Sequence, residues 1–108
     1  MEEWQSRSVG LLGTQGMEKL KNAKVAVFGV GGVGGYAAEA LARCGIGSIE
    51  LVDSDTVSVS NINRQIIATT KTVGQYKTDL MATRILEINP KATVTQKVCF
   101  FLPKNAVA

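Results

Sequence analysis

The chain has 108 residues, of which 45% are hydrophobic, and a formal net charge of +3. This length allows one domain at most, and the composition excludes an intrinsically disordered chain. The basic residues are scattered, so the charge permits an anionic partner without indicating one. Histidine is absent, and Cys44 and Cys99 form no CxxC pair. A Ser–His or Cys–His nucleophilic pair within the chain is therefore excluded, and no metal-ligand set is expected.

The N-terminal region predicts a helical arm over residues 1–23, with a short helix at residues 14–22. Residues 1–7 are polar and do not resemble a signal peptide. No apolar run is long enough to span a membrane, so we expect a cytoplasmic location. Residues 24–28 predict a first strand, whose apolar character is typical of a strand covered on both faces.

A helix and a second strand follow. Residues 32–44 place apolar side chains at helical spacing, and Gly45 supplies the stop signal. We interpret Cys44, at the end of this helix, as a small core residue. Residues 48–52 predict the second strand.

A long polar connection, residues 53–72, follows the second strand, and its length suggests a functional insert. A second helix is predicted over residues 72–89, ended by Pro90. Residues 92–98 alternate in polarity and predict a third strand.

The alternating elements predict an α/β fold. It is a Rossmann-like β-α-β-α-β mononucleotide-binding half over residues 24–108, with an N-terminal helix and a mostly parallel sheet. Met81 and Cys99 are expected in its core. In the full fold the first strand lies between the second strand and a fourth strand. Because this half lacks the fourth strand, we expect the sequence to be the N-terminal part of a longer protein.

The glycines that follow the first strand carry the strongest chemical signal. Residues 29–35 read Gly-Val-Gly-Gly-Val-Gly-Gly, between an apolar strand and a helix. Such a loop lets the backbone approach a pyrophosphate while the helix N-terminus faces the anion. Asp53 ends the second strand, where a βαβ unit presents a carboxylate to ribose. These features fit NAD and ATP sites alike.

The connection adds groups that suit a triphosphate. Arg64 can form two hydrogen bonds to phosphate, and Lys77, one turn into the predicted helix, can reach the same charge. Asn61 can hold ribose or a phosphate oxygen. Asp55 either contacts a metal ion or, as we favour, caps the loop.

Three linked motifs make the interpretation specific. GxGGxG begins at Gly29, DxDxVxxSNxxRQ begins at Asp53, and VGxxK ends at Lys77. From about residue 6 to residue 90 the chain resembles the ubiquitin-activating-enzyme-like superfamily, the ThiF/MoeB/HesA adenylating enzymes. Residues 61–65 (NINRQ), with residues 39–47 before them, are most similar to its branch of tRNA threonylcarbamoyladenosine dehydratases.

The resemblance implies roles for individual residues. Those matching the family's nucleotide-binding positions are Gly29, Gly31, Gly32, Gly34, Asp53, Asn61, Arg64 and Lys77. It implies that the glycines form the nucleotide loop, that Asp53 binds ribose and that the last three residues contact phosphates. Arg64, Lys77 and Arg7 are implied to be catalytic, Arg7 by entering the partner subunit's active site. ATP, a homodimer, and Mg²⁺ held by an acidic residue beyond residue 108 are also implied.

The resemblance further implies a tRNA substrate, whose threonylcarbamoyl carboxylate is adenylated and then cyclises with loss of AMP. One alternative is adenylation of the C-terminal Gly-Gly of a ubiquitin-like sulfur-carrier protein. An NAD-binding oxidoreductase domain would explain the glycines and Asp53, but not Arg64 and Lys77. A non-catalytic dimerisation or scaffold module also stays open.

Overall fold

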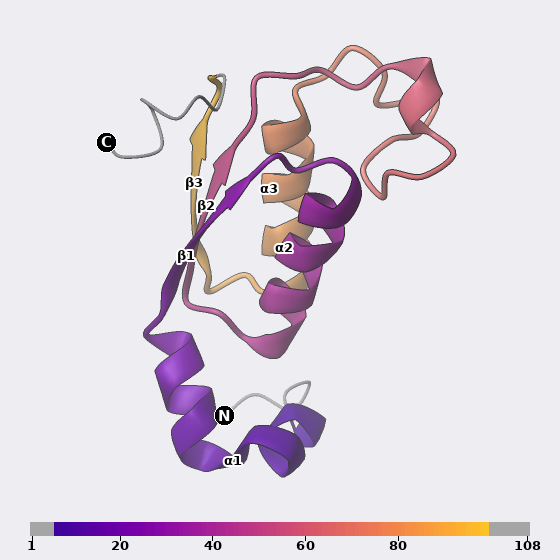
Figure 1. Ribbon diagram of the computed structural model, residues 1–108. Coiled ribbons are helices and arrows are strands. Elements are labelled where there is room, and N and C mark those ends of the chain that lie inside the picture. Colours follow the sequence, from indigo (N-terminus) through magenta and orange to yellow (C-terminus); the bar gives the residue numbers. More distant parts are fainter. Residues whose placement is uncertain (1–5, 100–108) are drawn as a thin grey trace.

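The computed structural model describes the backbone of residues 6–99, together with the side chains except those of residues 6–12 and 14. Three parallel strands form one sheet, and two helices pack against it (Figure 1). The elements in chain order are α1 (Ser6–Lys21), β1 (Lys24–Phe28), α2 (Gly32–Cys44), β2 (Ser48–Val52), the 3₁₀ turn η2 (Val59–Asn61), α3 (Lys77–Ile88) and β3 (Thr93–Lys97).

The sheet confirms the predicted parallel β-α-β-α-β arrangement. Its strand order is β1-β2-β3, so β2 lies in the middle. Lys24 pairs with Ser48, and Ser48 pairs with Thr93. Because the strands are parallel, the carboxyl ends of β1 and β2 meet at one edge of the sheet, next to the start of α2 (Figure 1). This edge is where ligands bind in open α/β sheets.

The core lies between the sheet and the two helices. Its fully buried large side chains include Ile49 and Leu51 from β2, and Met81 and Ile85 from α3. From α2, small alanines let the helix pack closely on the sheet. Met81 is therefore a core residue, as predicted.

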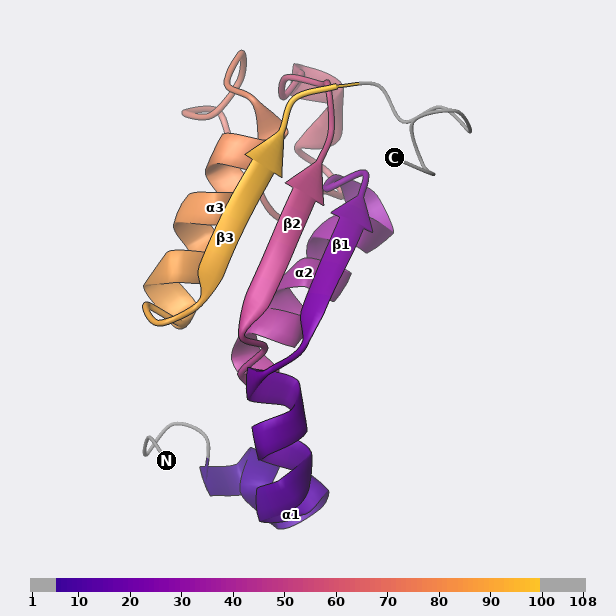
Figure 2. The ribbon, with the colours of Figure 1, turned by 90° about the vertical axis from the view of Figure 1, so that its left-hand side faces the viewer.

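The other face of the sheet differs from the prediction. Figure 2 shows the strands with α2 and α3 both behind them, and within residues 6–99 no helix covers the face toward the viewer. In β1 only Val27 is buried, whereas Ala26 is exposed and Phe28 is 45% exposed. Coverage of β1 on both faces is thus wrong for the part of the chain that is described.

Helix α1 is longer than predicted. It begins at Ser6 rather than residue 14, and it bends at Gly13, where φ is 73° and ψ is 167°. Only glycine adopts such a backbone at low cost. The chain is helical on both sides of this bend. The helix lies at the amino ends of the strands, away from the glycine loop (Figures 1 and 2).

Helix α3 starts five residues later than predicted. Gly74 has a φ of 90°, and its N–H donates to the carbonyl oxygen of Val57 at 2.8 Å. A short antiparallel bridge also joins Thr56 to Tyr76. These contacts hold residues 72–76 in an extended turn, so Lys77 is the first residue of the helix and not one turn inside it.

The remaining elements agree closely with the prediction. The bounds of β1, α2 and β2 are as predicted, α3 ends one residue early, and β3 is one residue shorter at each end. Cys44 is partly buried, whereas Cys99 is exposed. The prediction of a core position for Cys99 is wrong, because it follows β3, an edge strand that is itself mostly exposed.

Candidate functional site

The glycine loop turns the chain from β1 into α2. Gly29 has a φ of 81°, and its N–H donates to the carbonyl oxygen of Val52 at 2.8 Å. Gly32, the first residue of α2, has a φ of 52°. Both conformations are strained for any residue with a side chain. Between them Val30 is fully buried, which anchors the loop to the core.

Gly34 and Gly35 are required for a different reason. A Cβ at Gly34 would overlap the carbonyl oxygen of Gly29, and one at Gly35 would lie 2.6 Å from the carbonyl oxygen of Val30. The first turn of α2 therefore lies directly against the backbone of the loop. This close packing directs the helix N-terminus, with its unpaired N–H groups, toward the edge of the sheet.

Asp53 connects the glycine loop to the long connection. One carboxylate oxygen, Oδ2, accepts the N–H of Val30 at 2.9 Å, and Oδ1 accepts the N–H of Asp55 at 2.8 Å. Each oxygen has a further lone pair. The carboxylate is thus held beside the loop and can still accept hydrogen bonds from ribose hydroxyls.

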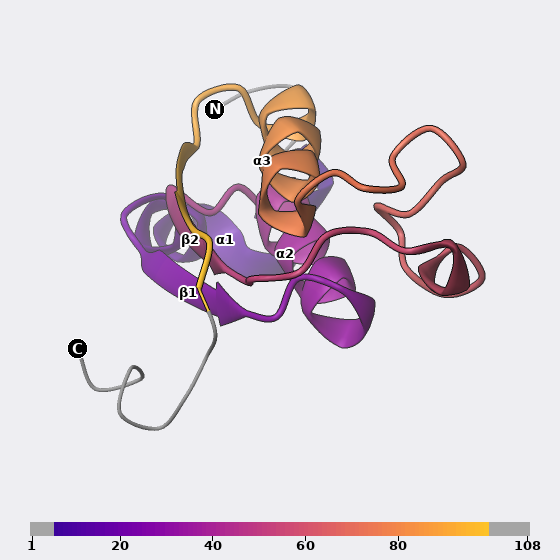
Figure 3. The ribbon, with the colours of Figure 1, turned by 90° about the horizontal axis from the view of Figure 1, so that it is seen from above.

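The connection is closed at its base. Val57 N–H donates to the carbonyl oxygen of Gln75 at 2.9 Å, beside the hydrogen bond from Gly74 to Val57. Seen from above, the segment between these residues extends outward from the sheet, beyond α2 and α3 (Figure 3). The connection is therefore a loop whose two ends are held together by backbone hydrogen bonds.

Asn61 holds the turn that carries Arg64. It is 7% exposed, and its Oδ1 accepts the N–H of Ser58 at 2.9 Å. Its own carbonyl oxygen accepts the N–H groups of Arg64 and Gln65, at 3.2 and 2.9 Å. Asn61 therefore has a structural role, and its side-chain amide nitrogen remains available as a donor.

The guanidinium of Arg64 lies on its own turn. Its Nη1 donates to the carbonyl oxygen of Ser60 at 2.8 Å and to Oδ1 of Asn63 at 3.1 Å. The residue is exposed. Over residues 6–99 it forms no ion pair with a carboxylate, so the structure does not join Arg64 to Lys77 or Asp53 by direct contacts.

Lys77 is nearly buried. Its side chain is 9% exposed, and its Nζ lies 4.0 Å from Oδ2 of Asp55, whose side chain is 63% exposed. The backbone N–H of Lys77 donates to the carbonyl oxygen of Asp55 at 3.1 Å. Asp55 thus pairs with Lys77 instead of capping the loop. A buried ammonium with one carboxylate at this distance is weakly compensated, and a bound anion would compensate it further.

Arg7 lies in the first turns of α1, at the far end of the sheet from the glycine loop of its own chain, and its side chain lies outside the described part (Figure 1).

Within residues 6–99 no group of three or more His, Cys, Asp or Glu side chains could hold a metal ion. Over the same range no helix combines the length and apolarity needed to cross a membrane.

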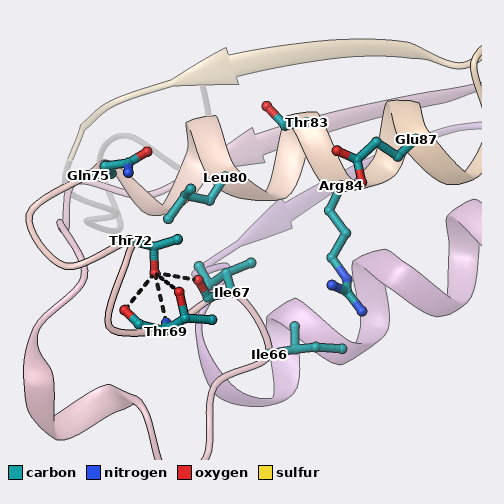
Figure 4. Close-up of a pocket in the computed structure, with 9 residues that line it drawn as sticks. All are labelled: Ile66, Ile67, Thr69, Thr72, Gln75, Leu80, Thr83, Arg84 and Glu87. Carbon is teal, nitrogen blue, oxygen red and sulfur yellow. Dashed lines mark hydrogen bonds between the residues drawn. The ribbon is translucent and has the colours of Figure 1, made fainter.

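A groove of about 320 Å³ lies elsewhere, between the connection and α3 (Figure 4). It is lined by Ile66, Ile67, Thr69, Thr72, Gln75, Leu80, Thr83, Arg84 and Glu87. Thr72 Oγ1 accepts the N–H of Thr69 and donates to the carbonyl oxygen of Ile67, which shapes one wall. None of the predicted site residues lines this groove.

Sequence reasoning assigned no role to Gln65, although its side chain lies against Gly31 of the glycine loop. The signal that could have identified Gln65 is its place directly after Arg64, at the end of the motif DxDxVxxSNxxRQ. A contact between residues this far apart in the chain has no periodicity that would reveal it.

Comparison with known proteins supplies the family. The sequence pattern of the ThiF family matches residues 5–108. The tRNA threonylcarbamoyladenosine dehydratase of Bacillus subtilis is 54% identical over 96 residues, which are 89% of this chain and 38% of that protein. An adenylyltransferase and sulfurtransferase of Aspergillus clavatus is 41% identical over 88% of this chain and 19% of its own length.

The fold matches solved structures as well. The Escherichia coli tRNA N6-threonylcarbamoyladenosine dehydratase in complex with ATP aligns with a TM-score of 0.94 and 44% identity, over 97% of this chain and 43% of that one. The chain thus spans about 40% of the length of the dehydratase relatives that it matches.

Proposed function

The chain belongs to the ThiF family, and we propose that it forms the nucleotide-binding floor of an ATP-dependent adenylating enzyme. The observation that carries the proposal is the nearly buried Lys77 in the segment that follows Asp53 and the glycine loop. The glycine loop and Asp53 would be sufficient to bind NAD. Within the described residues the desolvated ammonium of Lys77 has one carboxylate partner, the exposed Asp55. Such a cation favours a ligand of higher negative charge, as a triphosphate is.

Each predicted residue then has a defined task. The loop of Gly29, Gly31, Gly32 and Gly34 lets the N-terminus of α2 face the phosphates. Asp53 accepts hydrogen bonds from ribose hydroxyls. Three groups contact the phosphates: the amide nitrogen of Asn61, the guanidinium of Arg64 and the ammonium of Lys77.

The reaction is adenylyl transfer. A substrate carboxylate oxygen attacks the α-phosphorus of ATP, the bond to the pyrophosphate oxygen breaks, and an acyl adenylate and pyrophosphate form. Lys77 and Arg64 stabilise the charge that develops on the phosphate oxygens. Mg²⁺, when bound, would neutralise part of the same charge, and we expect its acidic ligand beyond residue 108.

The proposed substrate is the threonylcarbamoyl group of modified tRNA. The support is the 54% identity to a dehydratase of that name, against 41% to an adenylyltransferase. The adenylate then cyclises and releases AMP, so the substrate loses one water molecule overall. This step requires no enzyme nucleophile, which suits a chain without histidine.

The proposed assembly is a homodimer with Arg7 reaching into the partner's site. The support is the place of α1, at the end of the sheet opposite to the glycine loop (Figure 2). An arginine in that helix cannot readily reach the site of its own chain. A cytoplasmic location stays a prediction.

Two binding and activity measurements on the full-length protein test the proposal. Calorimetric titration should give binding of ATP and little of NAD; tight NAD binding without ATP binding would overturn it. Pyrophosphate release should then depend on tRNA carrying the threonylcarbamoyl group. Release that requires a ubiquitin-like carrier with a C-terminal Gly-Gly would instead favour the sulfur-transfer branch.

A further inference from the structure

The contact between Gly31 and Gln65 ties the glycine loop to the turn that carries Arg64. A Cβ at Gly31 would lie 2.5 Å from Oε1, 2.8 Å from Cδ and 2.9 Å from Nε2 of Gln65. The backbone of Gly31 has φ −88° and ψ 169°, which any residue adopts. The carboxamide of Gln65 is therefore what excludes a side chain at this position.

The other glycines of the loop have different reasons to be glycine. Gly29 and Gly32 have positive φ and open space where a Cβ would be, and Gly34 lies against the backbone of Gly29. Gly31 alone among these four is restricted by the end of a flexible side chain. The presence of glycine at position 31 is therefore explained by a contact between the glycine loop and the connection.

Gln65 gains no hydrogen bond from this position. Its Oε1 is buried and has no partner within the described residues, an arrangement that folded proteins usually avoid. Its backbone is nevertheless fixed, because its N–H donates to the carbonyl oxygen of Asn61. The side chain is thus held by packing on Gly31 and by the turn from Asn61 to Gln65.

We propose that Gln65 is a positioning residue for adenylyl transfer: its carboxamide, packed on Gly31, sets the place of the adjacent Arg64 relative to the glycine loop. The inference rests on the proposed function. Among residues 6–99, Arg64 forms hydrogen bonds only within its own turn, so the position of the turn decides where its guanidinium lies. The side chain of Gln65, the next residue, lies against Gly31 of the loop.

The proposal predicts that Gly31 and Gln65 act as one unit. A Cβ at Gly31 would displace the end of Gln65 without disrupting the fold, because a flexible side chain can rotate away. Gly31→Ala and Gln65→Ala should therefore impair the same property. Misplacing a catalytic group by about 1 Å can lower a rate by up to about 100-fold.

A double-mutant cycle in the full-length protein tests this, with ATP–pyrophosphate exchange as the assay. We expect each single variant to lower kcat about tenfold or more, with a small change in KM for ATP. The double variant should be no worse than either single variant. Gln75→Ala, in the turn between the connection and α3 and outside the site, is the matched control and should retain the wild-type rate.

If the loss of kcat in the double variant equalled the product of the two single losses, the proposal would be overturned. Gly31 would then have a role that does not depend on its contact with Gln65. A rise in KM for ATP at unchanged kcat would overturn it too. Failure of the proposed function is distinguishable, since the wild-type protein would then show no exchange. In that event the same cycle on thermal unfolding still tests the contact: additive changes in Tm would exclude it.

Discussion

At the scale of single residues, the site combines a neutral framework with a few charged groups. The framework is made by glycines that bring backbone atoms close together, Gly34 to Gly29 above all. Asp53 is bound to two backbone N–H groups, so its position depends little on side-chain rotation. Lys77 has its side chain desolvated before any ligand binds. Preorganised charge of this kind is effective because little reorganisation accompanies the reaction.

The substitution Lys77→Met tests this charge. Methionine keeps most of the volume of the buried side chain but removes the ammonium, so the fold should persist. We expect the kcat of ATP–pyrophosphate exchange to fall about 100-fold to 1,000-fold. Lys71→Met, at an exposed lysine of the same connection, is the control. A Lys77→Met enzyme with wild-type kcat would show that the ammonium has no catalytic role.

The substitution Gly34→Ala tests the close approach in the loop. The added methyl group would overlap the carbonyl oxygen of Gly29, and the backbone must move to accept it. We expect a loss of about 1–3 kcal/mol in the free energy of unfolding, together with loss of ATP binding. Val33→Ala, at the neighbouring position that is 86% exposed, should change neither. Thermal denaturation and calorimetry measure both, and an unchanged Tm for Gly34→Ala would contradict the close packing.

At the scale of elements, an ionic contact joins α2 to α3. Glu39 of α2 pairs with Arg84 of α3 and, at 3.3 Å, with Arg43 one turn further along its own helix. The hydrogen bond from Arg84, with the charges of both arginines, lowers the pKa of Glu39 below its ordinary value of 4.5, and desolvation opposes this only in part. The two helices are thus fastened beside the core that they share.

This contact predicts a sensitivity to acid. Because the pKa of Glu39 is lower in the folded state, its stabilisation is complete above pH 4.5 and is lost as the pH falls through the folded pKa. The Glu39→Gln variant should be about 0.5–1 kcal/mol less stable than wild type at pH 7. The difference should vanish at low pH.

Chemical denaturation of the full-length protein at pH 7 and at pH 3 measures the difference. Glu87→Gln serves as the control, since Glu87 is exposed on α3 and has no ion pair in the described part of the chain. A difference between wild type and Glu39→Gln that is the same at both pH values would refute the assignment.

The accuracy of the element predictions depended on how locally each boundary is determined. Helix α2 starts at Gly32 and is stopped after Cys44 by Gly45, whose left-handed conformation is a local property, and its bounds were predicted correctly. The starts of α1 and α3 were not, because Gly13 permits a bend within a helix and Gly74 is held by a hydrogen bond to Val57. Such contacts across a loop leave no periodic trace in the sequence.

The site was predictable where a motif linked residues to a chemical need. The glycine loop and Asp53 come together at the sheet edge as expected. The burial of Lys77 and its pairing with Asp55 were not foreseen, because they depend on how the connection folds back onto α3. Gln65 was missed for the same reason.

At the scale of the whole molecule, the described chain has one core on one side of its sheet. Ile49 in β2 is fully buried there, while Phe28 at the end of β1 is 45% exposed. The helices α2 and α3 therefore stabilise the sheet from a single face (Figure 3). Substitutions on the two faces should differ strongly in cost.

The pair Ile49→Ala and Thr95→Ala tests this asymmetry. Ile49 has no exposed surface, whereas Thr95 of β3 is exposed and pairs with Glu50, whose side chain alternates with that of Ile49 to the other face of the sheet. Truncating the buried residue should cost about 2–5 kcal/mol, and truncating the exposed one well under about 1 kcal/mol. Urea denaturation of the full-length variants measures both. Similar costs at the two positions would contradict the one-sided core.

The strand order has a consequence for synthesis on the ribosome. The strand in the middle, β2, is made before β3, and translation adds about 5–20 residues per second. Asp53 and its partner Val30 both belong to the part that emerges first. Lys77 follows later, with α3. A nascent chain therefore acquires Asp53, the proposed acceptor for a ribose, before it acquires Lys77, the proposed cation for phosphates. Its affinity for a nucleotide should then appear late, once α3 has docked.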